Sequence, residues 1–504
     1  MTSIPVIAAL DVGTSGVKVA LIATNGLTHT RAYASYPTRT GTLGEVEQDP
    51  AHWWEGAVAA LAQCAQLENV VALSVTGHMQ DLICLDVNGS VRPAMLYSDT
   101  RAGAQFTRLS DQLPDWANRT GNVQDSSTVP AKIAWLAENE PQTLERATSL
   151  LFSASAFVLW RAGGESACDV TTASATGLLD VRRRGWYEDA VVASGARLDQ
   201  LPRLVHDQGS NAIVGTLLAE AAAELGLPVG IPLVMAMGDA GSTTDGLVGS
   251  LPGSTSLYLG TTGWFAQVVH ASTAEQAEDP TAPNHLHCLV LPQWQNRLRI
   301  GAVLSAGASS AWALSTFLPG LTFAQAETLV AARLESSSPS QLLCLPGLSG
   351  ERTPVRDNNA RGVFVGATNQ TDALDFYIAV LVGVAMSLRH AADDLGLPLG
   401  PLALVGGATA SASWRRIIAS VFGVPVLTRG GEEPGTVSAA LAAVNALELD
   451  HQIRPIFAGQ DAIQETLPME HATLAYRLLL PIHRGLYDAL QPTFHTLAHL
   501  PSHP

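Results

Sequence analysis

The chain has 504 residues, of which 47% are hydrophobic and 14% charged, and its formal net charge is −17. A chain of this length exceeds a single hydrophobic core, so we expect at least two large domains. The negative net charge would repel a polyanion. The short basic run at 182–184 is typical of a solvated turn. Nucleic acid is therefore not expected as a partner.

The five cysteines are scattered and form no CxxC pair, which is typical of small core residues in a reducing compartment. The N-terminal apolar run has neither a basic lead nor a small-residue cleavage site, so it does not resemble a signal peptide. No uninterrupted apolar segment reaches the roughly 18 residues that a membrane span needs. We therefore expect a soluble, cytoplasmic protein that does not use a membrane.

The first 90 residues predict antiparallel strands, then a helix, then further strands. Five runs have strand character: 6–10, 17–23, 27–36, 70–77 and 82–86. Asn25-Gly26 is a hairpin signal between the second and third runs. Residues 49–67 begin at an Asp-Pro pair and keep helical apolar spacing. This order predicts a layered α/β domain.

The first strand ends in a turn that suggests chemistry. Asp11 follows the apolar run directly, and Gly13, Thr14 and Ser15 form the turn behind it. Glycine lets backbone N–H groups approach a ligand closely, and such turns bind oxyanions such as phosphate. A carboxylate beside a phosphate makes sense if Mg²⁺ lies between them, and Lys18 could add charge there. The alternative is that Asp11 only caps its own turn.

The same pattern returns almost half the chain later. Residues 254–270 read as a strand, a turn at Gly260, Thr261 and Thr262, and a second strand. The recurrence suggests two domains of common ancestry, although Gly-Thr turns between strands are also common by chance. The second turn lacks the carboxylate and the lysine. We therefore expect the two turns to hold one shared ligand from unequal sides.

The C-terminal half also alternates predicted strands and helices. Residues 401–428 predict a strand, a Gly-Gly turn, a helix and a strand, and residues 432–447 predict an Ala-rich helix. Residues 471–500 are mainly helical and could pack on either half, including back on the first. We predict two domains, with these boundaries: 1–237 and 238–504.

The sequence contains neither a Walker A motif nor a GxGxxG motif, so neither a P-loop nor a Rossmann phosphate cradle is predicted. A nucleotide would instead lie between the two hairpins. Gly406 and Gly407 at a helix start would offer a flat backbone surface for its adenosine. Close packing of a helix on a strand explains that glycine pair equally well.

A second carboxylate ends an apolar strand near the middle of the chain. Asp239 follows the apolar residues 231–237 in a glycine-rich turn, and such strand ends border the ligand crevice of an α/β sheet. In phosphoryl transfer to an alcohol the protein positions the reactants and accepts the hydroxyl proton late, which an aspartate can do. Asp245 competes for this role. We favour Asp239 because it directly terminates the strand.

Five segments resemble, in order, the successive motifs of the FGGY carbohydrate kinases, nearest to the xylulokinase branch. They are LDVGTSGVKVALI, GDAGSTTDGLVG, LYLGTTGW, LSGERTPVRDNNARGVF and LVGGATASASWRRIIASVFGVPV. The resemblance covers nearly the whole chain. It implies an α/β fold of two RNase-H-like domains of the actin/hexokinase ATPase type, with ATP and sugar in the cleft between them.

The resemblance also implies roles for particular residues. Asp239 would be the catalytic base, and Asp11 and Asp239 would be the ligands of Mg²⁺. The implied ATP-binding residues are Gly13, Thr14, Ser15, Lys18, Gly260, Thr261, Thr262, Gly406 and Gly407. The implied sugar-binding residues are Met79, Gln80, Asp99 and Asp239.

The sugar side departs from the family pattern. Xylulokinase-like chains carry Gly-Gln-Met-His-Gly where residues 77–81 read Gly-His-Met-Gln-Asp. Gln80 thus stands at the family histidine; it can hydrogen-bond a hydroxyl but does not titrate near neutrality. Asp81 replaces a glycine, and His78 is interpreted as an ordinary polar residue at a strand end. Asp99 matches the family's substrate aspartate and could accept hydrogen bonds from two vicinal hydroxyls.

We therefore predict ATP-dependent phosphorylation of a sugar hydroxyl, with D-xylulose or another ketopentose as the first candidate. Ribulose, erythritol or glycerol-type substrates stay open, because Gln80-Asp81 lies where selectivity is decided. An actin- or chaperone-like ATPase and a non-catalytic sugar sensor are the alternatives of other classes. Of Trp53 and Trp54, one is expected in the core and the other either there or against the sugar. The resemblance also suggests a homodimer.

Overall fold

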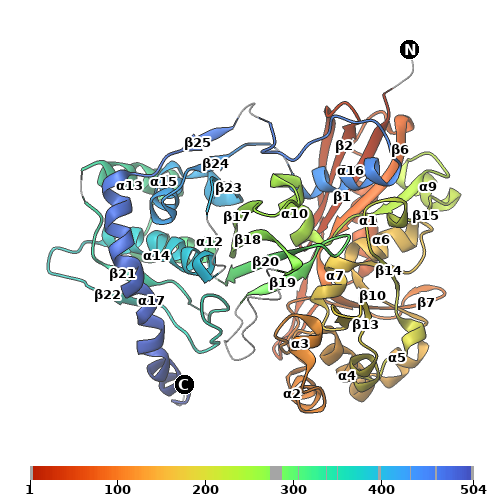
Figure 1. Cartoon of the computed structure of the whole chain (residues 1–504), viewed down its shortest axis with the longest axis horizontal. Helices are drawn as coiled ribbons and strands as arrows, with labels where there is room; N and C mark the ends of the chain where they lie inside the picture. Colours follow the sequence, from red (N-terminus) through yellow and green to blue (C-terminus); the bar gives the residue numbers. More distant parts are fainter. Residues whose placement is uncertain are drawn as a thin grey trace.

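The computed structural model describes residues 4–272, 286–304, 306–336, 338–348, 350–394, 399–431, 433–459 and 463–500. Two large sheets flanked by helices organise the molecule (Figure 1). The N-terminal strands lie in one half of the molecule and the C-terminal helix lies in the other.

The elements of the first half are β1 (Val6–Gly13), β2 (Gly16–Ala23), β3 (Thr28–Ser35), β4 (Arg39–Thr40), β5 (Val46–Gln48), α1 (Pro50–Leu61), β6 (Val70–Gly77), β7 (Met79–Asp86), β8 (Gly89–Ser90), β9 (Ala94–Met95), α2 (Gly103–Gln112), α3 (Trp116–Thr120), α4 (Val129–Asn139), α5 (Pro141–Arg146), β10 (Ser149–Ser153), α6 (Ala154–Ala162), β11 (Ala167–Asp169), α7 (Val170–Ala175), β12 (Leu179–Asp180), β13 (Gly185–Trp186), α8 (Glu188–Ser194), β14 (Arg203–Val205), β15 (Ile213–Thr216), α9 (Ala219–Leu225) and β16 (Pro232–Met235).

The elements of the second half are α10 (Asp239–Val248), β17 (Thr255–Leu259), β18 (Gly263–His270), β19 (His287–Val290), β20 (Asn296–Val303), α12 (Gly307–Phe317), α13 (Phe323–Ser336), β21 (Leu343–Leu345), β22 (Val363–Val365), α14 (Ala373–Asp394), β23 (Leu402–Val405), a 3₁₀ turn (Gly407–Ala410), α15 (Ala412–Phe422), β24 (Val426–Thr428), α16 (Pro434–Ala446), β25 (Gln464–Thr466) and α17 (Glu470–Ala498).

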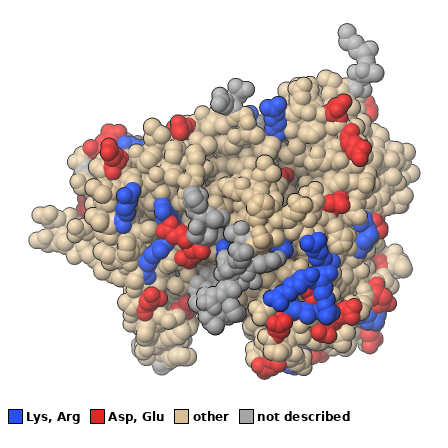
Figure 2. Space-filling model, viewed as in Figure 1, with Lys and Arg blue, Asp and Glu red and all other residues tan. Residues whose placement is uncertain are grey.

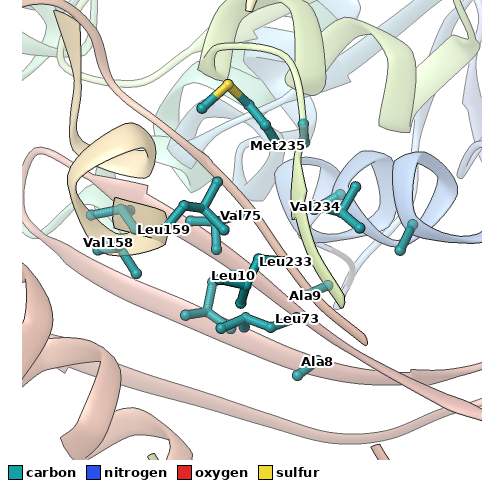
Figure 3. Close-up of a cluster of buried hydrophobic side chains, with 14 of the residues drawn as sticks. Ala8, Ala9, Leu10, Leu73, Val75, Val158, Leu159, Leu233, Val234 and Met235 are labelled. Carbon is teal, nitrogen blue, oxygen red and sulfur yellow. The ribbon is translucent and has the colours of Figure 1, made fainter. Parts of the chain in front are cut away.

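The first sheet has the order β15-β16-β6-β1-β2-β3, in which β16, β6 and β1 are parallel and β1, β2 and β3 are antiparallel. The strands predicted at the N-terminus are confirmed. The central strands are apolar on both faces because helices cover both, as parallel sheets require. Figure 3 shows this core, where Leu10, Leu73 and Leu233 of adjacent strands lie near Val158 and Leu159 of α6.

The second sheet repeats this arrangement. Its order is β19-β20-β18-β17-β23-β24-β25, with β17, β23 and β24 parallel and β20, β18 and β17 antiparallel. The series β3-β2-β1-β6-β16 is therefore matched by β20-β18-β17-β23-β24, and the two predicted hairpins occupy equivalent places. Their turns differ by one residue: Gly13 pairs with Gly16 in the first hairpin, and Leu259 pairs with Gly263 in the second.

The helix α16 lies far along the chain but packs on the first sheet. It contacts β1, β6 and β16 and also α10 (Figure 1). The last helix, α17, packs instead on α14, α15 and β21 of the second half. The helix that packs on the first half is thus α16, and not the last helix, α17, for which the sequence had left this open. The predicted boundary between residues 237 and 238 separates the strands of the two large sheets and stays a prediction.

Side chains of the first half close the free edge of β19. The side-chain amide of Asn122 donates to the carbonyl of Cys288 at 2.8 Å and accepts from its N–H at 2.7 Å. Thr171 donates to the carbonyl of Val290, and the N–H of Val290 donates to Ser174. These hydrogen bonds tie α7 and the loop before α4 to the second sheet, so the two halves are connected away from their central strands.

One described helix, α14, is long and apolar enough to cross a membrane by composition alone. Most of it is buried inside the protein, where it packs on α12, α15 and β21. We therefore interpret α14 as a core helix of the second half. On the face shown in Figure 2, the largest group of Lys and Arg side chains is bordered by Asp and Glu. The run 182–184 is an exposed turn, as predicted.

Candidate active site

Asp11 and Asp239 lie at the same edge of the first sheet. Asp11 lies near the C-terminal end of β1, and β1 is parallel to β6, which is parallel to β16. Asp239 begins α10 a few residues after β16. Because the carboxyl ends of parallel strands meet at one edge, the fold brings the two carboxylates together. Burial raises the pKa of Asp239, and the charge of Asp11 raises it further, which indicates that the two carboxylates are close.

The turn that carries Asp239 is held by buried polar groups. Asp169 caps α7 and also accepts the N–H of Gly238 at 3.1 Å. Thr76 of β6 donates to the carbonyl of Met237 at 2.6 Å. Burial and the nearby charge of Asp11 raise the pKa of Asp239 to about 7. A carboxylate with that pKa is a better proton acceptor near neutrality than an ordinary aspartate.

Lys18 faces Asp11 across the first hairpin. The register pairs the two residues directly, with Lys18 Nζ 4.0 Å from Asp11 Oδ2. The same ammonium is 2.7 Å from Oε2 of Glu433, which precedes α16 and was not predicted from the sequence. Burial alone would lower the pKa of Lys18, but Asp11 and Glu433 raise it, with a smaller contribution from Tyr258. Tyr258 belongs to the second hairpin, so the two hairpins lie near each other.

Asp245, the other candidate base, accepts hydrogen bonds from two serine side chains and so has a structural role. Its Oδ2 accepts from Ser438 of α16 at 2.8 Å, and its Oδ1 accepts from Ser250. Both oxygens are therefore engaged, and the residue links α10 to α16. Asp239 differs in that its only hydrogen-bond partner among the described residues is the N–H of Ala240, at 2.8 Å.

Asp245→Ala is expected to lower the free energy of unfolding by about 1–3 kcal/mol, because the buried hydroxyl of Ser438 and the partly buried hydroxyl of Ser250 lose their acceptor. Denaturant unfolding of the variant measures this loss. The turnover number of the folded variant should fall far less than that of Asp239→Asn. A folded Asp245→Ala protein whose turnover is as low as that of Asp239→Asn would reverse the assignment of the base.

Hydrogen bonds from two side chains hold the backbone of the first turn. The hydroxyl of Tyr36 donates to the carbonyl of Gly13, and the amide of Gln48 donates to that of Thr14 at 2.7 Å. Thr14 Oγ1 is 3.4 Å from the hydroxyl of Tyr97. Ser15 is exposed at the tip. Because the carbonyls of Gly13 and Thr14 are bonded inward, the exposed side chain of Ser15 lies on the outside of the turn.

The second turn and the glycine pair are adjacent. Gly406 follows β23 and lies against Leu259 and Gly260, at the start of the second turn. The carbonyls of Gly260 and Thr261 accept N–H groups from the start of α12. Thr261, Thr262 and Gly407 are exposed. The structure thus places the glycine pair next to the second turn, at the start of α12.

The predicted sugar side lies against the Asp239 turn. Met79 packs with the cluster of Met237, and a Cβ on Gly238 would lie only 2.6 Å from its sulfur. Gln80 has a positive φ of 68° and its amide is 3.5 Å from Ser127 Oγ. Its carbonyl accepts from the buried ammonium of Lys132 at 2.9 Å. Lys132 also binds the carbonyl that precedes Tyr97, so one lysine positions both segments of the site.

Asp99 is placed differently from the prediction. The side chain is fully buried, and Arg101 binds it through its guanidinium, with Nη2 2.6 Å from Oδ2. The N–H of Val46 donates to the same oxygen at 2.8 Å, and Arg101 also binds Glu47. Both carboxylate oxygens are therefore used within the protein. This geometry suits a residue that supports the wall of the site better than one that holds sugar hydroxyls.

Two features of the site were missed or left open in the sequence. His78, interpreted there as an ordinary polar residue, forms a buried hydrogen bond with Asp81, with Nδ1 2.7 Å from Oδ2. Local spacing did not signal this pair, because residues three apart in a strand normally point to opposite faces. Trp53 and Trp54 are both buried, so both belong to the core. The edge of Trp53 packs on the ring of His78.

The carboxylates fit a magnesium ion that arrives with a nucleotide. Among the described residues no group of three or more His, Cys, Asp or Glu side chains could hold a metal by itself. Asp11 and Asp239 supply hard oxygen ligands at one place, and Mg²⁺ commonly combines one or two carboxylates with substrate phosphates and water.

Comparison with known proteins defines the class of this protein. Residues 6–246 match the N-terminal domain, and residues 268–447 the C-terminal domain, of the FGGY family of carbohydrate kinases. The chain belongs to this family and is a sugar kinase. It is 31% identical over 494 residues to the xylulose kinase of Escherichia coli (strain K12), covering 96% of this chain and 99% of that protein.

Solved structures agree with this fold. The ligand-bound xylulose kinase of Lactobacillus acidophilus superposes with a TM-score of 0.86 at 22% identity, over 98% of this chain and 100% of that chain. The gluconate kinase of the same organism gives 0.87 at 23% identity, with the same coverage. Both likenesses confirm the two-domain actin/hexokinase-like fold. Kinases named for different sugars fit equally well, so the fold alone does not select the substrate.

Proposed function

We propose that this protein transfers the γ-phosphoryl group of ATP to a hydroxyl of a ketopentose, with D-xylulose as the first candidate. The observation that carries the proposal is that Asp11 and Asp239 lie at the same edge of the first sheet, close enough for the charge of Asp11 to act on Asp239. The 31% identity to a xylulose kinase over nearly the whole chain supports the choice of sugar.

In the proposed reaction the protein positions two substrates and accepts one proton. The turns at 13–15 and 260–262 would bind the phosphates, and the surface at Gly406 would bind the adenosine. Asp11 and Asp239 would hold Mg²⁺, which neutralises charge on the phosphates when bound. Asp239 would orient the sugar hydroxyl and take its proton late in the transfer, which suits its raised pKa. Closure of the cleft would exclude water, which otherwise competes for the phosphoryl group.

The test is ADP release with ATP and Mg²⁺ over a panel of ketopentoses, tetritols, glycerol and sugar acids. We expect little release without sugar and strong stimulation by one ketopentose. Stimulation by a polyol or a sugar acid alone would replace the proposed substrate. Release that ignores every sugar would contradict the kinase proposal and favour a conformational ATPase.

The remaining predictions concern the setting of the enzyme. The scattered cysteines are typical of a reducing compartment, so we propose that the enzyme works in the cytoplasm. The homodimer suggested by the family resemblance stays a prediction, which sedimentation of the purified protein tests.

A further inference from the structure

A buried histidine–aspartate pair lies beside Asp239. Nδ1 of His78 is 2.7 Å from Oδ2 of Asp81, and the two side chains are 1% and 0% exposed. The other carboxylate oxygen, Oδ1, accepts the backbone N–H of Tyr97 at 3.1 Å. Both oxygens of Asp81 are thus held, and the bond at Nδ1 fixes the orientation of the imidazole.

The opposite ring nitrogen, Nε2, is buried and has no hydrogen-bond partner among the described residues. The backbone N–H of His78 donates to the carbonyl of Val12 at 3.0 Å, which places the residue next to the first hairpin. The charges of Asp239 and Asp11 both act on the ring. Buried polar atoms are nearly always paired in native proteins, so an unpaired nitrogen beside a substrate site calls for a partner.

The neighbouring residues do not provide that contact. Gln80, which stands at the family histidine position, has its amide near Ser127 and its carbonyl bound by Lys132. The histidine and the glutamine have thus exchanged places relative to the family pattern. The aspartate that replaces the family glycine is the residue that binds the displaced histidine. The three departures form one connected structural change.

We propose that His78, oriented by Asp81, binds the sugar through Nε2 and determines which sugar is accepted. This inference rests on the proposed kinase function and adds the group that reads the substrate. With Nδ1–H donated to Asp81, Nε2 accepts a hydrogen bond from a hydroxyl; a doubly protonated ring donates to a hydroxyl or carbonyl oxygen. Because the ring neighbours Asp239, the recognised oxygen is one close to the phosphorylated carbon of a ketose or polyol.

The test compares His78→Gln, Asp81→Asn and the double variant His78→Gln/Asp81→Gly on the sugar panel. The double variant removes both partners and so leaves no unpaired buried carboxylate if His78→Gln alone fails to fold. We expect each folded variant to lose about 10- to 100-fold in kcat/KM for the preferred sugar, the scale of one lost hydrogen bond to a buried group. The loss should be unequal between sugars that differ at one hydroxyl, while the Kd for ATP stays unchanged.

A triple variant, His78→Gln/Gln80→His/Asp81→Gly, restores the family order of residues. We expect it to recover kcat/KM on D-xylulose relative to His78→Gln, which a purely structural role of the pair would not produce. The matched control is His483→Gln, because His483 is equally buried, in α17, and bonds the carbonyl of Cys344 at 3.0 Å. This control should leave the ratios among sugars unchanged.

A direct readout is the ¹⁵N resonance of Nε2 in histidine-labelled protein. Addition of the preferred sugar should shift the His78 signal and leave the His483 signal in place. An equal loss of kcat/KM for all sugars, with no shift of the His78 signal, would overturn the inference and leave the pair a packing element. If wild-type protein shows no sugar-stimulated ADP release at all, the proposed function fails instead.

Discussion

Asp239→Asn is expected to bind ATP nearly as tightly as the wild type and to lose at least about a hundredfold in turnover, the scale of a lost proton acceptor. Asparagine keeps the size of the side chain but cannot take the hydroxyl proton. ATP affinity, measured by titration calorimetry, and the turnover number with the preferred sugar are the two readouts. Turnover close to that of the wild type would remove Asp239 from the role of base.

The pH dependence gives a second check on the same residue. Because the pKa of Asp239 is raised to about 7, the free enzyme loses its proton acceptor as the pH falls through that value, and wild-type kcat/KM should decrease below about pH 7. The raised pKa also means that ionised Asp239 destabilises the fold. Without Mg²⁺, Asp239→Asn should therefore be more stable than the wild type at pH 8, and the difference should shrink between pH 7 and pH 4.

Gly406→Ala is expected to disrupt the second phosphate turn. Gly406 has φ 98° and ψ 179°, a conformation that almost only glycine adopts. An added Cβ would also collide with the carbonyl of Leu259, directly before Gly260. We expect the free energy of unfolding to fall by about 1–3 kcal/mol, the scale of such backbone strain. The KM for ATP should rise at least about tenfold, which corresponds to about 1.4 kcal/mol of binding free energy.

Gly407→Ala is the matched variant at the next position. A Cβ there meets no atom within 4 Å, and the residue has no positive φ. Its free energy of unfolding should stay within about 0.5 kcal/mol of the wild type, as for an ordinary surface substitution. If Gly407 borders the adenosine, its KM for ATP should still rise. Equal stability of the two variants would contradict the account of Gly406.

The local patterns of this sequence predict its strands and turns well. The hairpin with Asp11, the Asp-Pro start of α1 and the turn at Asp239 are each encoded within a few residues, through alternation of apolar side chains, capping and glycine. The nearness of Asp11 and Asp239 follows from a general rule for parallel strands. That part of the site could therefore be inferred before the structure was known.

The remainder depends on contacts between distant segments. Lys132 reaches the carbonyl of Gln80 from a helix about fifty residues away, and Glu433 reaches Lys18 from the other half of the chain. The N–H of Val46, from a separate strand, binds the carboxylate of Asp99 in addition to Arg101, which is only two residues away. Local spacing does not encode such partners. These distant partners decide whether a polar side chain can bind substrate or is already hydrogen-bonded within the protein.

The position of α16 has a consequence for biosynthesis. The core of the first sheet includes Val437 and the alanines that follow it in α16, as well as Ile453 and Ile456. A nascent chain that ends near residue 246 would therefore expose one apolar side of its central strands, although it already contains every strand of that sheet. The N-terminal half should stay dependent on chaperones or aggregate until ribosomes have translated the segment that carries α16.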